Sequence, residues 1–265
     1  MILSSASPVS VVLGIATVAA YALQAAAASR KPLKYAQGTL LVAWLLHGLT
    51  LAWSMLGGSP RFGFAPALSI TAWLVLTVYA VESQVFPLLK ARWALALLGA
   101  AAVLLALFFP GKPLHVSASA WLPLHLALGI ASYGLFAAAV VHAWLMMRAE
   151  RHIRHADTSN DSLPLLTLER LTFRFATAGF VLLTATLLAG WLFGETLYGH
   201  AWRWEHKTMF SLLAWLVFAA LLLGRSRFGW RGRTAVRVLY AGSLLLLMAY
   251  VGSRFVLEVV LHRGA

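Results

Sequence analysis

Residues 175–193 read FATAGFVLLTATLLAGWLF, a run without a charged side chain. A helix of about 20 apolar residues spans the hydrocarbon core of a bilayer. In hydrocarbon every backbone amide needs a partner within the protein, so only helices and closed barrels cross a membrane. Apolar and polar residues do not alternate along this run, as they do in the strands of a membrane barrel. The run therefore predicts a transmembrane α-helix.

The chain contains seven more runs of this kind, roughly at residues 9–28, 36–56, 64–81, 93–109, 121–147, 208–224 and 235–261. Hydrophobic residues make up 61% of the chain and charged residues 11%, and the mean hydropathy is +0.81. Such a composition leaves too little polar surface to cover a water-soluble domain. We therefore expect an all-α, polytopic integral membrane protein with about eight transmembrane helices. No internal repeat of about 20 to 50 residues is visible, so residues 1–265 are expected to form a single domain.

The net charge of +13 would suggest a nucleic-acid partner in a soluble protein, but its distribution indicates a membrane protein. If the eight runs alternate across the bilayer, 15 of the 21 basic residues fall in loops on one side. The positive-inside rule places these loops, including a long basic loop over residues 148–174, in the cytoplasm. We expect a multi-pass protein of a bacterial inner (plasma) membrane, with both termini periplasmic and no nucleic-acid partner. The 15 residues are Arg30, Lys31, Lys34, Lys90, Arg92, Arg148, Arg151, Arg154, Arg170, Arg174, Arg225, Arg227, Arg231, Arg233 and Arg237.

The first run differs from a secretory signal, because no basic residue precedes it and a basic cluster follows it. We expect it to be a retained helix. The chain has no cysteine, which excludes disulfides and thiolate metal ligands.

Nine histidines are numerous for a membrane protein, and imidazole is a common ligand of haem iron. His47 falls near the middle of the second run, where an ionisable group is a functional hypothesis by default. The alternative is a neutral imidazole that bonds to a neighbouring helix. On the expected outer side lie His115, His125, His200, His206 and His262, whereas His142, His152 and His155 fall on the cytoplasmic side.

The loop before the seventh run carries Trp202-Arg-Trp-Glu-His-Lys207. Tryptophan alone is enriched at membrane interfaces. Here acidic, basic and histidine side chains accompany it, and the outer start of the fifth run adds His125. Such a surface suits a flat aromatic ligand that bears carboxylates: indoles stack on its plane, Lys207 meets a carboxylate, and two histidines from different segments bind a central iron. No catalytic nucleophile or acid/base pair is found, so an enzyme is not the favoured interpretation.

Four stretches match one family in order and residue type. They are Ser119-Ala-Trp-Leu-Pro-Leu-His125 with Ser132-Tyr133 behind it, Trp202-Arg-Trp-Glu-His-Lys-Thr-Met-Phe210, Gly229-Trp-Arg-Gly232, and the segment from Tyr250 to His262. The chain thereby resembles the cytochrome c assembly membrane proteins, the haem-handling superfamily that includes CcsA/ResC and CcmC, and within it the small eight-helix YpjD/HemX-type branch. The resemblance is strongest over residues 80–265.

The resemblance implies that His125 and His262 are the axial ligands of a non-covalent, b-type haem. It also implies cofactor-binding roles for residues of the tryptophan-rich motif: Trp202, Trp204, Glu205, His206 and Lys207. His47 is a further candidate, because it falls near the middle of a predicted transmembrane helix. In the family's motif, an aspartate, a proline and a second acid stand where this chain has Glu205, His206 and Thr208. The cytoplasmic-side histidine of CcsA-type proteins has no counterpart, because the stretch here is Leu221-Leu-Leu-Gly-Arg225. The resemblance thus supports an outer haem site and gives no support for haem export.

The expected function is haem binding that assists cytochrome c assembly or haem handling at the outer face. Haem, the lipid bilayer, and apocytochrome c or other cytochrome maturation components are the expected partners. The alternative is a membrane accessory or regulatory protein of tetrapyrrole synthesis, or of a neighbouring transporter, that binds no haem. A permease is less well supported, because the sequence shows few broken helices or buried charges.

Overall fold

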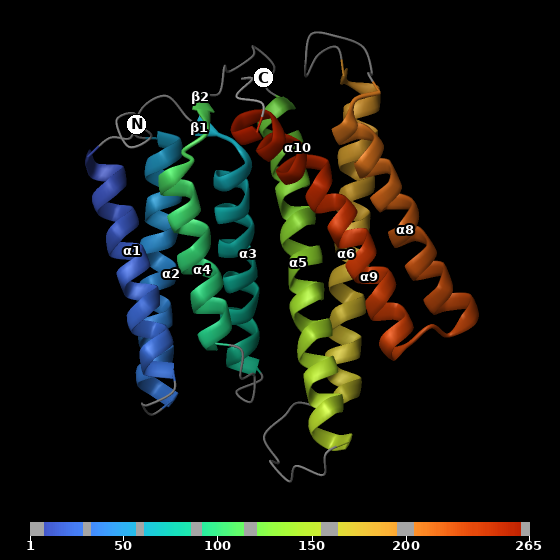
Figure 1. Cartoon of the computed structure of the whole chain (residues 1–265). Helices are drawn as coiled ribbons and strands as arrows, with labels where there is room; N and C mark the ends of the chain where they lie inside the picture. Colours follow the sequence, from blue (N-terminus) through green and yellow to red (C-terminus); the bar gives the residue numbers. More distant parts are fainter. Residues whose placement is uncertain are drawn as a thin grey trace. The chain divides into compact units, whose positions relative to one another are not determined.

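The computed structural model describes residues 8–28, 33–56, 61–85, 92–113, 121–154, 164–194 and 204–260. These residues are almost entirely helical (Figure 1). Seven helices among them are long and apolar enough to cross a membrane, and an eighth, shorter apolar helix covers Trp93–Phe108. The prediction of an all-α polytopic membrane protein is therefore confirmed. The placement of both termini outside, and of a single domain over the whole chain, stay predictions.

The helices pack as two compact units, residues 1–115 (unit 1) and 116–265 (unit 2). Unit 1 contains α1 (Pro8–Ala28), α2 (Leu33–Leu56), α3 (Phe64–Val85) and α4 (Arg92–Phe108). Helix α1 packs against both α2 and α4, and α3 packs against α4.

Glycine allows α1 and α4 to approach each other closely. A Cβ atom built on Gly99 of α4 would lie 2.8 Å from the ring of Tyr21 in α1. Two short antiparallel strands, β1 (Arg61–Phe62) and β2 (Lys112–Pro113), join the connections at one end of unit 1. Gly111, with φ of 74°, makes the turn into β2.

Unit 2 is a bundle of α5 (Trp121–Arg154), α6 (Leu165–Leu192), α8 (His206–Phe228) and α9 (Gly232–Leu247). Each helix packs against two others: α5 against α6 and α9, and α8 against α6 and α9 (Figure 1). The last helix continues beyond α9 through a π-helical turn (Met248–Gly252), α10 (Ser253–Phe255) and a second π-helical turn (Val256–Val260).

Stacked aromatic rings fill the centre of unit 2. Phe136 of α5 and Phe218 of α8 stack with ring centroids 3.7 Å apart. Glycines make room for both rings: a Cβ on Gly179 would lie 3.2 Å from Phe136, and one on Gly242 would lie 2.7 Å from Phe218. The four helices of unit 2 therefore converge on one interlocked core.

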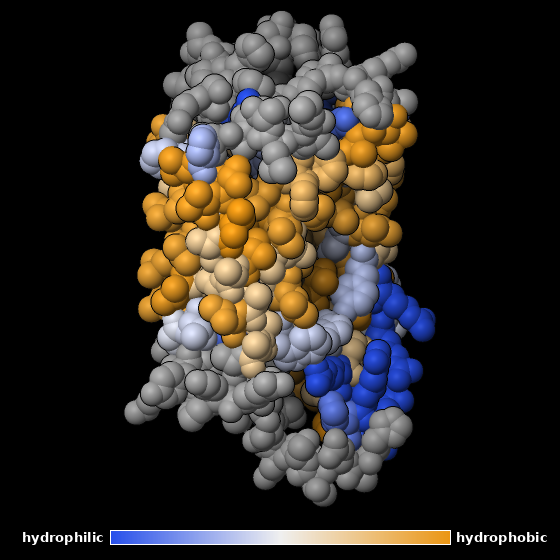
Figure 2. Space-filling view, turned by 60° about the vertical axis from the view of Figure 1, so that its left-hand side comes forward, coloured by the Kyte–Doolittle hydropathy of each residue, from blue (hydrophilic) through white to orange (hydrophobic). Residues whose placement is uncertain are grey.

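The surface follows the pattern of a protein in lipid. Figure 2 shows apolar side chains around the middle of the helices and hydrophilic side chains gathered beyond one end of that band. Leu188 and Leu244, for example, are 49% and 59% exposed. Contiguous apolar surface of this kind is rare on soluble monomers and normal against hydrocarbon.

The prediction of a loop over residues 148–174 is wrong at both ends. Helix α5 continues to Arg154, and α6 begins at Leu165, directly after Pro164. Leu168 and Thr172 are buried, so the first turns of α6 pack against the interior of unit 2. They do so although Glu169, Arg170 and Arg174 interrupt the apolar run. A run of apolar residues marks the hydrocarbon, whereas a helix can extend past it.

Candidate functional site

The motif end of unit 2, where α5 and α8 begin and α6 ends, contains the first candidate ligand. His125 lies in the second turn of α5 and is half-buried, with its Nδ1 atom shielded from solvent. Lys207 lies in the first turn of α8, at the same end of unit 2 as His125. The structure thus brings together two site residues predicted from separate parts of the sequence.

Glu205 forms an ion pair with Lys207. Its Oε2 atom lies 3.1 Å from Nζ of Lys207, and the two side chains are 42% and 49% exposed. Glu205 has extended backbone angles, and its carbonyl accepts a hydrogen bond of 3.0 Å from the amide of Met209, which starts α8. An exposed ion pair of this kind contributes about 0–1 kcal/mol. Lys207 is therefore readily available to another carboxylate.

Trp204 and His206 complete the described part of the motif. The Trp204 side chain is 69% exposed, and His206 is exposed as the first residue of α8. An exposed indole beside a cation offers a flat surface to an aromatic acid. Trp202 and His262, both predicted as site residues, lie outside the described residues, so their roles stay predictions.

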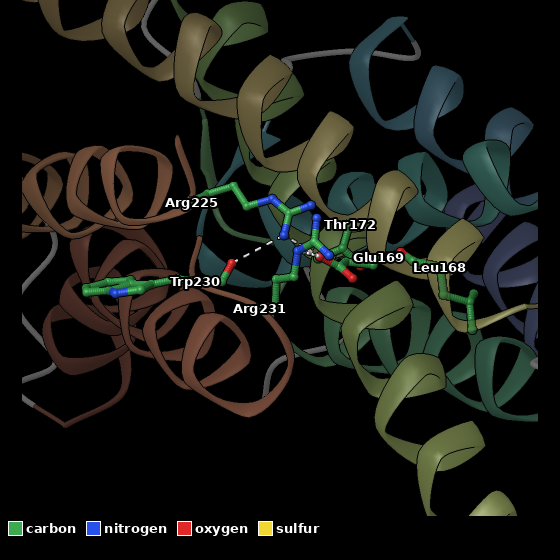
Figure 3. Close-up of polar contacts among 6 residues, drawn as sticks. All are labelled: Leu168, Glu169, Thr172, Arg225, Trp230 and Arg231. Atoms are coloured by element: carbon green, nitrogen blue, oxygen red, sulfur yellow. Dashed lines mark hydrogen bonds and ion pairs between the residues drawn. The ribbon is translucent and has the colours of Figure 1, made fainter. Parts of the chain in front are cut away.

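At the opposite, basic end of unit 2, α5 and α8 end and α6 and α9 begin, and a largely buried acid pairs with two arginines. Glu169 of α6 forms ion pairs with Arg225 and with Arg231, the latter at 3.5 Å (Figure 3). Arg225 also lies 4.6 Å over the ring of Phe173 and donates a hydrogen bond of 3.4 Å to the carbonyl of Trp230. These contacts fasten the α8–α9 connection to α6.

The Gly229-Trp-Arg-Gly232 stretch forms the tight connection between α8 and α9. Gly229 ends α8 with φ of 65°, in the left-handed region that favours glycine. Its turn folds Trp230 back, so that the Trp230 amide donates to the carbonyl of Gly224 at 3.1 Å. The indole packs so closely on Gly224 that a Cβ there would lie 2.3 Å from the ring. The stretch therefore forms a packed corner between α8 and α9.

Comparison with known proteins identifies the family. The sequence model of the family described as Cytochrome C assembly protein matches residues 33–261, most of the chain. The chain belongs to the cytochrome c assembly protein family. This assignment confirms the resemblance seen in the sequence.

Two kinds of relative are similar to the chain over most of its length. The inner membrane protein YpjD of Escherichia coli K12 is 30% identical over 196 residues, 73% of each chain. The cytochrome c biogenesis protein CcsA of Synechococcus sp. CC9902 is 25% identical over 235 residues, 77% of each chain. CcsA of Chlamydomonas reinhardtii is 26% identical over 220 residues, 79% of this chain and 62% of the relative. No solved structure matches the chain.

In this family member, His47 lies in unit 1 and is fully buried. Its Nδ1 atom is 3.0 Å from the Tyr21 hydroxyl, and its Nε2 atom is 2.9 Å from the Ser69 hydroxyl. The imidazole therefore links α1, α2 and α3, which favours the interpretation of a neutral histidine bonded to neighbouring helices. A role in cofactor binding would require one of these two hydrogen bonds to break, and it stays a prediction.

Sequence reasoning missed one contact that organises the last helix. The hydroxyl of Tyr133 in α5 donates a hydrogen bond to the carbonyl of Leu246, just before the first π-helical turn. Within that region the Ser253 hydroxyl donates to the carbonyls of Ala249 (2.8 Å) and Tyr250 (3.0 Å). A π-helical turn changes the partners of backbone carbonyls, and in hydrocarbon each carbonyl still needs a donor. The sequence signals for Tyr133 are its hydroxyl within an apolar run and its place in a stretch that matches the family, and neither identifies the Leu246 carbonyl as its partner.

Proposed function

We propose that this protein binds haem at the motif end of unit 2 and assists cytochrome c assembly or haem handling at the outer face of the inner membrane. The observation that carries the proposal is the placement of His125 and Lys207 in the first turns of α5 and α8, at the same end of unit 2, because an imidazole can ligate iron and a cation can pair with a propionate. Family membership supports the connection with cytochrome c assembly.

The residues present fit such a group. A bound haem supplies an iron with two axial positions and two negatively charged propionates. His125 and His262 would hold the iron, and Lys207, which forms an ion pair with Glu205, would bind a propionate. Among the described residues no three His, Asp or Glu side chains gather to hold a metal ion, whereas haem iron needs at most two protein ligands.

Aromatic side chains supply the rest of the proposed surface. Trp204 offers an exposed indole, and His206 offers a further imidazole on the first turn of α8. Trp202, which lies outside the described residues, is proposed to add a second indole. His47 is left out of the proposed haem site, since both of its ring nitrogens have hydroxyl partners in unit 1.

The charge distribution supports the proposed orientation. The basic end of unit 2 carries the arginines that the positive-inside rule assigns to the cytoplasm, so the motif end faces the periplasm. The name of the relative YpjD, an inner membrane protein, supports the same membrane. Apocytochrome c or another cytochrome maturation component would then meet the site from the periplasmic side.

A pair of histidine variants tests the ligand assignment. Detergent-purified His125→Ala protein, supplied with haem, is expected to lose the bis-histidine absorption spectrum and most of its haem. His152→Ala removes an imidazole from the basic end of the same helix and is expected to retain both. Equal haem content and identical spectra in the two folded variants would show that His125 is not a ligand. Wild-type protein that takes up no haem would instead support the accessory role without haem.

A further inference from the structure

A stripe of exposed aromatic and basic side chains follows α5 toward the basic end. Trp144, Arg148 and Arg151 are spaced by four and three residues, which places them on one face of the helix. All three side chains are exposed, and the Arg148 guanidinium lies 5.6 Å over the Trp144 ring. Along the helix the aromatic side chain comes first and the two cations follow, nearer the basic end.

A second stripe on α9 has the same composition in reverse order. Arg233, Arg237 and Tyr240 have the same four and three spacing, and all three are exposed. Because α9 runs away from the basic end while α5 runs toward it, the aromatic residue of each stripe lies deeper in the bundle than its arginines. Leu244, one turn beyond Tyr240 on the same face, is 59% exposed.

The two stripes meet along the contact between α5 and α9, which are neighbours in the bundle (Figure 1). The Arg233 Nε atom lies 4.0 Å from Oε1 of Glu150 on α5. We call the six residues of the two stripes the basic seam: Trp144, Arg148, Arg151, Arg233, Arg237 and Tyr240.

The basic seam has an excess of positive charge. Glu150 is the acid that pairs with it, and this carboxylate also forms an ion pair with Arg154. The positive-inside rule accounts for the number of arginines at this end. It does not account for two stripes on neighbouring helices in which an aromatic residue lies farther from the basic end than two arginines.

We propose that the basic seam binds the headgroup of an anionic phospholipid from the leaflet that surrounds the basic end. Guanidinium groups bind phosphate oxygens in pairs. Tryptophan and tyrosine are enriched at the level of the headgroups, and basic pockets between transmembrane helices bind anionic lipids. Leu244 lies where an acyl chain would continue into the apolar band. Because an exposed apolar residue follows the basic seam, a lipid with acyl chains fits this surface better than free phosphate does.

Lipid titration of the full-length protein in detergent tests the proposal. The probes are dioleoyl phosphatidylglycerol and dioleoyl phosphatidylcholine, with inorganic phosphate as a soluble competitor, and bound lipid is counted by native mass spectrometry. Wild type is expected to retain phosphatidylglycerol in preference to phosphatidylcholine. The variant Arg148→Gln/Arg237→Gln is expected to bind phosphatidylglycerol about tenfold more weakly.

The matched control is Arg170→Gln/Arg227→Gln, which removes two exposed charges from the same end but outside the basic seam. It is expected to keep wild-type affinity within about twofold, whereas an equal loss in both variants would show that bulk charge alone attracts the lipid. A wild type without preference for phosphatidylglycerol, or displacement of the lipid by inorganic phosphate, would also overturn the proposal. If the double variant does not fold, each single variant carries the test, with an expected loss of about threefold.

Discussion

Glu169 of α6 and Arg225 of α8 form an ion pair across helix ends that are far apart in the sequence. The Glu169 side chain is only 12% exposed, and Arg231 shares its carboxylate. These ion pairs tie α8 and the start of α9 to α6.

Replacing the acid leaves two arginines without their counter-charge. Glu169→Gln is expected to lower the free energy of unfolding by about 1–3 kcal/mol, because a mostly buried charge-assisted hydrogen bond is lost. Thermal unfolding in detergent measures the change.

Glu150→Gln is the control for that variant. Glu150 pairs with Arg154, whose side chain is 57% exposed, and with Arg233, which is 54% exposed, so a loss below about 1 kcal/mol is expected. Equal unfolding temperatures for the two variants would contradict the structural weight given to Glu169.

The Tyr133 hydroxyl is expected to stabilise the π-helical end of the last helix. Tyr133→Phe removes the donor for the Leu246 carbonyl within the apolar region and should cost about 1–2 kcal/mol. Because His262 follows that end in sequence, the variant should also bind haem more weakly. Tyr240→Phe, at a half-exposed tyrosine of α9, is the control for both measurements, and a similar effect of the two substitutions would argue against a specific role of Tyr133.

His47 is expected to stabilise unit 1 without contributing to haem binding. His47→Leu leaves the Tyr21 and Ser69 hydroxyls without their imidazole partner and should lower stability by about 1–3 kcal/mol. The haem content per folded protein should stay at the wild-type value. A stable variant that has lost its haem would place His47 in the cofactor site after all.

Alanine substitutions at two glycines, one packed against Trp230 and one without a neighbour, are expected to change stability in opposite directions. Gly224→Ala should destabilise by about 1–3 kcal/mol, because its Cβ would lie 2.3 Å from the indole ring. Gly38→Ala in α2 meets nothing within 4 Å and should stabilise that helix by up to about 1 kcal/mol. Comparison of the two melting curves checks the signs, and a neutral Gly224→Ala would show that the indole does not pack against this position.

The sequence predicts the number and approximate position of the helices because burial in hydrocarbon requires long apolar runs. The positions of helix ends depend instead on side-chain packing and ion pairs. Helix α6 begins at Leu165, within the predicted loop, because Leu168 and Thr172 pack inward while Glu169 pairs with arginines. A hydropathy pattern carries no information on such pairings.

The motif end was partly predictable for a topological reason. Among the described helices, only α6 lies between α5 and α8 along the chain, so α5 and α8 run in the same direction and their first turns, with His125 and Lys207, lie at the same end. Tyr133 was not predictable, because its partner is a backbone carbonyl chosen by the rotation of α5 against the last helix. The partners of Glu169 were not predictable either, because the sequence offers many arginines with which it could pair.

The central claim is a specific haem site at the motif end, and a haem titration of the purified wild-type protein tests it most directly. Absorption spectra recorded as haem is added should saturate at one haem per chain, with the bands of a six-coordinate, bis-histidine haem. Absorbance that rises without saturation, or a saturated spectrum without histidine ligation, would contradict the claim.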